Sequence, residues 1–367
     1  MIPERLTTLV SIQELVSDLL SSTGPHIDNY SSPVFWNHLN AIHDFHLAYS
    51  SDYSIISRHF SPDLSYSGIP FIPVSLFKYY ALKSISDDQV YRILQSSGTS
   101  GQAPSRIYLD RINSKHQQIA LSTLFTSHTK LSRPNILILD TPATASRQAP
   151  FTARKAGILG FSSLCRKSFY ALKDDFTINY ESIESAIDSS SQLLIFGFTF
   201  IAYKYFLTQV QSFPSLPPIL KVVFLHGGGW KKLKDLSLST FQFNNLVLRK
   251  TQISNVINYY GMVEQTGTIF FECPHGYMHT NSLASLIPRN VDSLTPDFSV
   301  GDHPRIAQVL SALPTSYPGH SLLTDDLITI PYPVDDCTCG MKGLPFKIHG
   351  RIPKSEPRGC SDTYQSV

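Results

Sequence analysis

The sequence predicts an α/β protein with a largely parallel sheet, preceded by a helical region and followed by a smaller antiparallel part. Three apolar runs, NILILD (135–140), QLLIFGF (192–198) and KVVFLHGGG (221–229), have the pattern of buried strands that end in loops. Stretches of helix length separate them, which is typical of alternating strand and helix units. Of the 367 residues, 42% are hydrophobic and 16% are charged, so the chain can fill a sizeable core.

The flanking regions have different patterns. In residues 1–95, SIQELVSDLL (11–20) has apolar residues at helical spacing, and Ser32 followed by Pro33 is a typical helix start. Near the other end, RIAQVLSAL (305–313) and SLLTDDLITI (321–330) predict an antiparallel hairpin. We therefore expect a mostly helical region at 1–95, an α/β body at 96–350 and a short tail at 351–367.

Charge and composition exclude several classes of protein. Lys and Arg number 30 and Asp and Glu number 28, so the net charge of +2 provides no footprint for nucleic acid. The longest apolar run, 193–203, is shorter than the roughly 18 residues of a membrane span. Charged residues near the start argue against a signal peptide, and five cysteines do not form a secreted disulfide framework. We expect a cytoplasmic protein with no membrane span and no nucleic-acid partner.

Hydroxyl and glycine residues alternate in the segment QSSGTSGQAPSRIYLD (95–110). Such a loop lets backbone N–H groups approach a polyphosphate, and hydroxyls add donors. It lacks the lysine of the common phosphate-binding loop, so a flexible linker is the alternative. The candidate phosphate-binding residues are Ser96, Ser97, Gly98, Thr99, Ser100 and Gly101.

Three further motifs are weak when taken alone. NYYGMVEQTG (258–267) offers an aromatic ring to stack on a base and a carboxylate for Mg²⁺, or else an ordinary turn with a surface glutamate. HSLLTDDLITI (320–330) offers a carboxylate for ribose hydroxyls, and FKIHGRIPK (346–354) an arginine for phosphate. A hairpin turn and a strand-end charge would explain the last two equally well.

Together, the order of these motifs resembles the adenylate-forming superfamily, which activates carboxylates as acyl-adenylates with ATP and Mg²⁺. More closely, the chain is similar to the acyl-protein synthetase family (LuxE type), the ligase component of bacterial fatty acid reductase. The phrases SSGTSGQAPSRIYLDR, HGGGWKKL, YYGMVEQTGTIFFECPHGYMH, LPTSYPGHSLLTDDL, DDCTCGMKG and GRIPKSEPRGCSDT carry the likeness from Ser96 to Thr363. The resemblance implies the large α/β domain of that superfamily, with parallel sheets flanked by helices and a small antiparallel β subdomain.

The resemblance also implies roles for the motif residues. The hydroxyl-rich loop would cradle the ATP phosphates, Tyr260 would stack on or line the adenine pocket, and Glu264 would coordinate Mg²⁺. Asp326 would bind the ribose hydroxyls, with Asp325 in place of the usual glycine, and Arg351 would contact ribose or phosphate at a hinge. The shelf beside the adenine would consist of Gly227, Gly228 and Gly229.

The end of the chain departs from the superfamily pattern. Typical members continue after the hinge with a mobile domain that brings a catalytic lysine, whereas residues 352–367 are too few to fold as a domain. We therefore expect that the mobile C-terminal domain is lacking. The candidates for the missing cation are Arg106, Lys231 and Lys232, which could equally be solvated surface charges.

Cysteines provide two further hypotheses. Cys360 lies beside Arg358, and a neighbouring positive charge favours the nucleophilic thiolate. The resemblance implies that Cys360 accepts the acyl group as a thioester, while an inert tail cysteine is the alternative.

A separate set of residues offers three thiols and an imidazole for structural Zn²⁺, with His275 as a competing imidazole and plain buried thiols as the alternative. That set is Cys273, His279, Cys337 and Cys339, whereas Cys165 has no motif and is expected in the core.

The first functional hypothesis is an ATP-dependent acyl-protein synthetase. It would adenylate a carboxylic acid, expected to be a fatty acid, and transfer the acyl group to Cys360 for an acyl-reductase or acyl-transfer partner. The alternatives are a ligase of the phenylacetate type that uses coenzyme A or a carrier protein, and a non-catalytic scaffold of the same fold.

Overall fold

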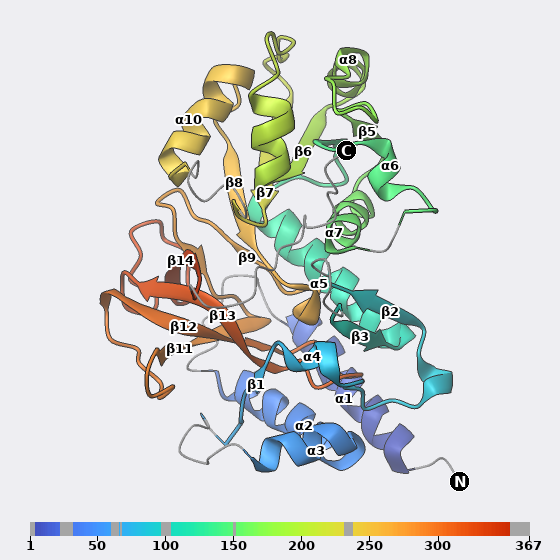
Figure 1. Cartoon of the computed structure of the whole chain (residues 1–367), viewed down its shortest axis with the longest axis vertical. Helices are drawn as coiled ribbons and strands as arrows, with labels where there is room; N and C mark the ends of the chain where they lie inside the picture. The colour runs from blue at the N-terminus through green and yellow to red at the C-terminus, as the bar shows by residue number, and fades with distance from the viewer. Residues whose placement is uncertain are drawn as a thin grey trace. The chain divides into compact units, whose positions relative to one another are not determined.

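The computed structural model describes residues 4–22, 32–59, 66, 68–96, 104–149, 152–230 and 238–352 (Figure 1). The chain divides into two compact units. Unit 1 comprises residues 1–96, 102–124 and 261–356, and unit 2 comprises residues 97–101, 125–260 and 357–367. The three-part division at 95/96 and 350/351 expected from the sequence stays a prediction.

Unit 2 is built on a parallel sheet, which confirms the expected α/β fold class. Its strands are β4 (Asn135–Ile138), β5 (Ser168–Tyr170), β6 (Gln192–Phe198), β7 (Lys221–Gly227) and β8 (Val256–Tyr260), in the order β5-β4-β6-β7-β8. All four pairings between these strands are parallel. Its helices are α6 (Pro142–Ala145), α7 (Ala153–Ser162), α8 (Tyr180–Asp188), α9 (Thr199–Ile201), the π-helix η3 (Ala202–Leu207) and α10 (Thr240–Thr251).

The apolar runs form these strands because both faces of the sheet are buried. Every residue of β4 is buried, as are Leu193–Phe198 in β6. Alternate side chains of a strand point to opposite faces, so each face needs its own cover. On one face α8 and α10 contribute Ile183 and Phe243 to an apolar cluster that also contains Phe224 of β7. Figure 1 shows α10 beside β7 and β8.

Unit 1 contains the predicted antiparallel sheet. Its strands run in the order β10-β14-β13-β12-β11, with β1 paired parallel to β13. They are β1 (Ile72–Pro73), β10 (Met278–His279), β11 (Ala284–Asn290), β12 (Gly301–Ser311), β13 (Ser321–Ile330) and β14 (Pro345–Arg351). The hairpin predicted from RIAQVLSAL and SLLTDDLITI is β12 and β13, joined by residues 312–320.

The remaining elements of unit 1 are mostly helical. They are α1 (Glu4–Ser22), α2 (Pro33–Tyr49), α3 (Ser51–Arg58), α4 (Leu76–Tyr79), η2 (Asp87–Gln89), η5 (Val263–Gln265) and the short strands β2 (Arg92–Gln95), β3 (Arg106–Leu109) and β9 (Phe270–Phe271). The unit boundary falls within α5 (Arg111–Thr129).

Local sequence chemistry explains where α2 begins. Ser32 is its N-cap, with the hydroxyl accepting a hydrogen bond from the Phe35 N–H at 3.5 Å, and Pro33 occupies the first turn. Both features satisfy or avoid the unpaired N–H groups of a helix start, as predicted.

Among the described residues, none of the helices combines the length and the apolar character needed to span a membrane.

Candidate functional site

In unit 2, the predicted adenine shelf lies where two neighbouring strands end. Gly227 closes β7 opposite Tyr259 of β8, and Tyr260 is the next and last residue of β8. A Cβ at Gly227 would lie 2.6 Å from the Tyr259 ring and 2.7 Å from its carbonyl oxygen, so only glycine fits. The structure therefore brings the glycine turn and Tyr260 to one edge of the sheet. That edge is where open α/β sheets bind ligands.

The two following glycines turn the chain away from the sheet. Gly228 and Gly229 have φ of +85° and +66°, a region that other residues enter only at a cost. A Cβ at Gly228 would lie 2.8 Å from the Phe198 ring, whereas one at Gly229 would meet nothing within 4 Å. Gly229 therefore presents open backbone, as a surface that receives a flat ligand requires.

A buried histidine supports this turn, and sequence reasoning missed it. The Thr199 hydroxyl donates to the Gly227 carbonyl at 3.0 Å and lies 2.9 Å from Nδ1 of His226. Because the hydroxyl has one hydrogen, His226 must donate from Nδ1, which leaves Nε2 as an acceptor. Burial lowers the pKa of His226 to about 3, so the ring is neutral at physiological pH. Thr199 and His226 hold the carbonyl of the predicted shelf.

A buried ion pair lies at the end of β4, also unforeseen. The Arg154 Nε donates to Asp140 at 2.5 Å, and its NH2 group donates to the other carboxylate oxygen. The Asp140 carboxylate also accepts hydrogen bonds from the Thr144 hydroxyl at 2.7 Å and from the Thr141 N–H at 2.6 Å. Strand order reverses between β4 and β6, the position where such sheets form a crevice. The pair thus joins the chain after β4 to α7 at the carboxyl edge of the sheet.

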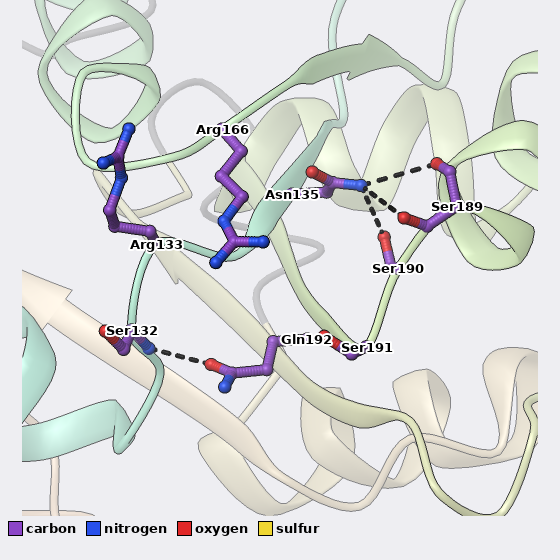
Figure 2. A pocket seen from close by; sticks show the side chains of 8 residues that line it. All are labelled: Ser132, Arg133, Asn135, Arg166, Ser189, Ser190, Ser191 and Gln192. Carbon is purple, nitrogen blue, oxygen red and sulfur yellow. Dashed lines mark hydrogen bonds between the residues drawn. The ribbon is translucent and has the colours of Figure 1, made fainter.

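A polar pocket lies at the opposite, amino edge of the same sheet (Figure 2). Asn135 and Gln192, the first residues of β4 and β6, line it together with Arg133 and Arg166. The Asn135 amide is already bonded to the Ser190 hydroxyl at 2.9 Å. With a volume of about 60 Å³ the pocket is too small for a nucleotide, so it does not compete with the carboxyl edge.

In unit 1, the predicted Mg²⁺ ligand Glu264 lies in the short helix η5 and is 6% exposed. Its carbonyl oxygen accepts a hydrogen bond from the Tyr317 hydroxyl at 2.9 Å. The neighbouring Gln265 side chain donates to the carbonyls of Val309 and Gly319, at 3.0 and 2.8 Å. Burial raises the pKa of Tyr317, and the nearby Glu264 carboxylate raises it further. Glu264 is therefore not the surface glutamate of the alternative interpretation.

The predicted ribose and hinge residues face each other across two strands. Asp326 of β13 and Arg351 of β14 are paired in the sheet register, and Arg351 Nε lies 3.5 Å from Asp326 Oδ1. Next to them, the Ile352 N–H donates to the Asp325 carbonyl at 2.9 Å. The side chains of Asp326 and Arg351 are 17% and 28% exposed, so the pair is accessible to a ligand.

The candidate phosphate loop connects β2 and β3. Ser96 closes its base, because its hydroxyl accepts from the Ser105 N–H at 2.8 Å and its own N–H donates to the Ser105 carbonyl. Arg106 begins β3 and is exposed. The other predicted residues lie outside the described part of the chain: Ser97, Gly98, Thr99, Ser100, Gly101, Lys231, Lys232 and Cys360.

The four predicted zinc ligands come together in unit 1. Their ligand atoms all lie within 4.8 Å of one another, and His279 Nε2 is 3.4 Å from Cys339 Sγ. Cys273 and Cys337 each precede a tight turn closed by a glycine N–H, from Gly276 at 2.9 Å and Gly340 at 3.1 Å. The cluster consists of Cys273, His279, Cys337 and Cys339.

This donor set fits a closed structural zinc site. Tetrahedral Zn²⁺ takes thiolates at about 2.3 Å and imidazole nitrogen at about 2.0 Å, so small inward shifts suffice. His279 Nδ1 lies 3.3 Å from the Lys342 carbonyl, which would leave Nε2 for the metal. His275 is exposed and outside the cluster, so His279 is the imidazole. Cys165 instead donates to the Phe161 carbonyl, and burial raises its pKa to about 12.

Solved structures share this fold. A 2-hydroxyisobutyryl-CoA ligase in an open conformation, in complex with 2-HIB-AMP and CoA, aligns with a TM-score of 0.67 and 13% identity, over 90% of this chain and 77% of that chain. The same ligase in its postadenylation state with 2-HIB-AMP aligns with a TM-score of 0.64 and 13% identity, over 89% and 69%. These likenesses establish the fold class of adenylate-forming ligases, as the sequence predicted.

The family follows from the sequence itself. Residues 18–366 match the family described as acyl-protein synthetase, LuxE, and the chain belongs to that family. Comparison with curated proteins gives no match. Membership of this family, together with the fold, assigns the chain to the adenylate-forming acyl ligases.

Proposed function

We propose that this protein activates a carboxylic acid, in particular a fatty acid, as an acyl-adenylate and transfers the acyl group to the thiol of Cys360. The observation that carries the proposal is the meeting of the Gly227–Gly229 turn with Tyr260 at the carboxyl edge of the sheet. An open glycine backbone beside an aromatic ring suits a flat base. In a chain of this family, that base is the adenine of ATP.

In the first step, a carboxylate oxygen attacks the α-phosphate of ATP and pyrophosphate leaves. Ser96 and the loop that follows it would hold the phosphates, and Asp326 would accept the ribose hydroxyls. Arg351, 3.5 Å from Asp326, would turn toward the nucleotide once ribose occupies that carboxylate. Glu264 would hold Mg²⁺, which would supply positive charge to screen the two anions.

In the second step, the Cys360 thiolate attacks the acyl carbonyl carbon. The new carbon–sulfur bond forms as the bond to the AMP oxygen breaks, and AMP leaves with the electron pair. The thiol proton passes to solvent before the attack. The thioester would then serve an acyl-reductase or acyl-transfer partner, in the cytoplasm.

The first experiment measures the intact mass of the protein after incubation with Mg·ATP and a panel of carboxylic acids. We expect an added mass of one acyl group on the wild type, and none on Cys360→Ser or Glu264→Ala. Cys165→Ser is the matched control, since that thiol is hydrogen-bonded within the fold and should leave acylation unchanged. The acid that gives the largest increment identifies the substrate.

Three outcomes would contradict this assignment. Pyrophosphate release without any added mass would show that the thiol acceptor is external, as in a coenzyme A or carrier-protein ligase. Absence of both product and ATP binding would indicate a non-catalytic scaffold. Retention of the increment in Cys360→Ser would place the acyl group on another residue.

We also propose that the Cys273, His279, Cys337 and Cys339 cluster binds structural Zn²⁺. All four ligands belong to unit 1 and lie in two segments, 273–279 and 337–339. A metal there would therefore link β10 to the loop before β14. Metal analysis of the purified protein should find one zinc, lost in Cys337→Ser and kept in Cys165→Ser. A zinc-free wild type with unchanged thermal stability would exclude the site.

A further inference from the structure

The segment between β12 and β13, residues 312–320, is buried throughout yet has no regular secondary structure. Buried backbone groups need hydrogen-bond partners, and irregular segments cannot provide their own. Side chains from far along the chain provide them instead. His38 Nε2 lies 3.1 Å from the Ala312 carbonyl, and His46 Nε2 lies 3.0 Å from the Pro314 carbonyl. Both histidines come from α2.

Two more contacts extend this support. The Asn113 amide donates to the Leu313 carbonyl at 2.6 Å, and the Ser84 N–H donates to the Ser316 carbonyl at 2.9 Å. Carbonyls 312, 313, 314 and 316 are therefore satisfied from the N-terminal helices and the chain that follows them. Without these donors the segment would carry unpaired polar groups in the core.

The far end of the segment is tied to α3. The Tyr53 hydroxyl lies 3.2 Å from His320 Nε2 and 2.8 Å from His43 Nδ1. The His46 ring stacks on His320 with centroids 5.2 Å apart. Tyr53 is 1% exposed and His320 is equally buried, so water cannot replace these bonds.

The segment in turn holds the backbone of the candidate Mg²⁺ ligand. The Tyr317 hydroxyl donates to the Glu264 carbonyl, and the Gly319 carbonyl accepts from Gln265. A Cβ at Gly319 would lie 2.9 Å from the Glu264 oxygen, which shows how closely the two backbones pack. A shift of the segment would therefore move Glu264.

We propose that α2 and α3 act as a positioning element for Glu264, through His46, Tyr53 and the buried segment 312–320. The inference rests on the proposed role of Glu264 in binding Mg²⁺. It gives the N-terminal helices a function in adenylation that does not require contact with any substrate.

The experiment uses the full-length protein and two variants that each lose one hydroxyl. Tyr317→Phe removes the hydrogen bond to the Glu264 carbonyl, and Tyr53→Phe removes the contact with His320 at the far end of the segment. Tyr49→Phe on α2 is the matched control, because the half-buried Tyr49 packs against an apolar cluster and its hydroxyl has no hydrogen bond among the described residues. One measurement is amide hydrogen exchange of peptides from residues 261–270. The other is the Mg²⁺ concentration at half-maximal ATP–pyrophosphate exchange, taken well below the melting temperature.

We expect Tyr317→Phe to speed amide exchange in 261–270 and to raise the half-maximal Mg²⁺ concentration about five- to tenfold, as one lost hydrogen bond implies. The KM for the carboxylic acid should stay unchanged. Tyr53→Phe should shift both quantities in the same direction by a smaller factor. A purely structural role would lower the melting temperature without moving the Mg²⁺ dependence.

Values equal to those of Tyr49→Phe in both measurements would overturn the proposal. If the wild type shows no ATP–pyrophosphate exchange with any acid, the proposed function fails. The amide exchange then decides the positioning role by itself, because it requires no catalysis.

Discussion

The two units bury very different cores. In unit 2 the interior is built from apolar strands, and its core cluster joins Leu137, Ile195, Phe224 and Phe243. In unit 1 many fully buried side chains are polar or charged, among them Arg289, Arg305, Gln308 and His46. An apolar core tolerates any neighbour of suitable size, whereas a buried polar group needs one particular partner.

The candidate sites differ in the same way. The shelf of unit 2 lies on adjacent strand ends, so its place in the unit follows from the order of strands. The Glu264 region of unit 1 depends on hydrogen bonds between residues more than fifty positions apart, such as Tyr317 with Glu264. Substitutions and acid should therefore affect the two units differently.

The largest effect should come from a buried polar contact of unit 2, its ion pair between Arg154 and Asp140. Arg154→Met leaves the Asp140 carboxylate buried without its partner, which should lower the free energy of unfolding by about 3–5 kcal/mol. Urea unfolding measures the loss. The double variant Asp140→Leu with Arg154→Met should recover most of it, and failure to do so would show that the pair also shapes its surroundings.

Acid should affect unit 1 more than unit 2. In unit 1, burial lowers the pKa of His46 to about 3 and also lowers the pKa of His38 and of His320. In unit 2, burial lowers the pKa of His226 to about 3. Between pH 6.5 and 3 His46 is protonated in the unfolded chain and neutral in the folded chain. Stability is therefore full above pH 6.5 and falls with decreasing pH, by about 1.4 kcal/mol per pH unit for His46, and His38 and His320 act in the same direction.

Hydrogen exchange at pH 7.5 and pH 5.5 measures this difference. Peptides of residues 312–320 should lose protection before those of β6 and β7. His46→Gln should weaken the pH dependence, and exposed His59→Gln should leave it unchanged. Equal loss of protection in both units would contradict the contrast.

Two glycines of the shelf provide a matched pair. Gly227→Ala forces a methyl group into the Tyr259 ring and should cost about 1–3 kcal/mol, with loss of ATP binding. Gly229→Ala meets no atom within 4 Å and should cost only about 1 kcal/mol, through its positive φ. Thermal unfolding and ATP titration compare them. A smaller effect at Gly227 than at Gly229 would rule out close packing as the reason for the glycine.

The smallest effect on stability should come from the exposed pair in unit 1. Arg351→Met removes its contact with Asp326, and partly exposed pairs contribute about 0.2–1 kcal/mol. Adenylation should fall much further than stability, since both residues are proposed to contact ATP. Comparison of the melting temperature with the rate of ATP–pyrophosphate exchange separates the two. Equal losses would assign Arg351 to the fold rather than to the site.

Several elements were predictable because their causes are local. The strands β4, β6 and β7 coincide with continuous apolar runs, and α2 begins at Ser32 and Pro33 as cap chemistry requires. The contact between Asp326 and Arg351 could not be predicted from the sequence, because it depends on the register of two strands. The same holds for the choice of His279 over His275, which the pairing of β10 with β14 decides.

The sequence by itself determined the parallel sheet, the glycine turn after β7 and the family, since each depends on short runs of residues. Only the tertiary structure decided which buried polar groups meet: His226 with Thr199, Tyr53 with His320, and four zinc ligands from separate segments. The physical reason is range. An apolar run is buried wherever the sheet forms, but a hydrogen bond requires two atoms about 3 Å apart, and packing of the whole unit sets that distance.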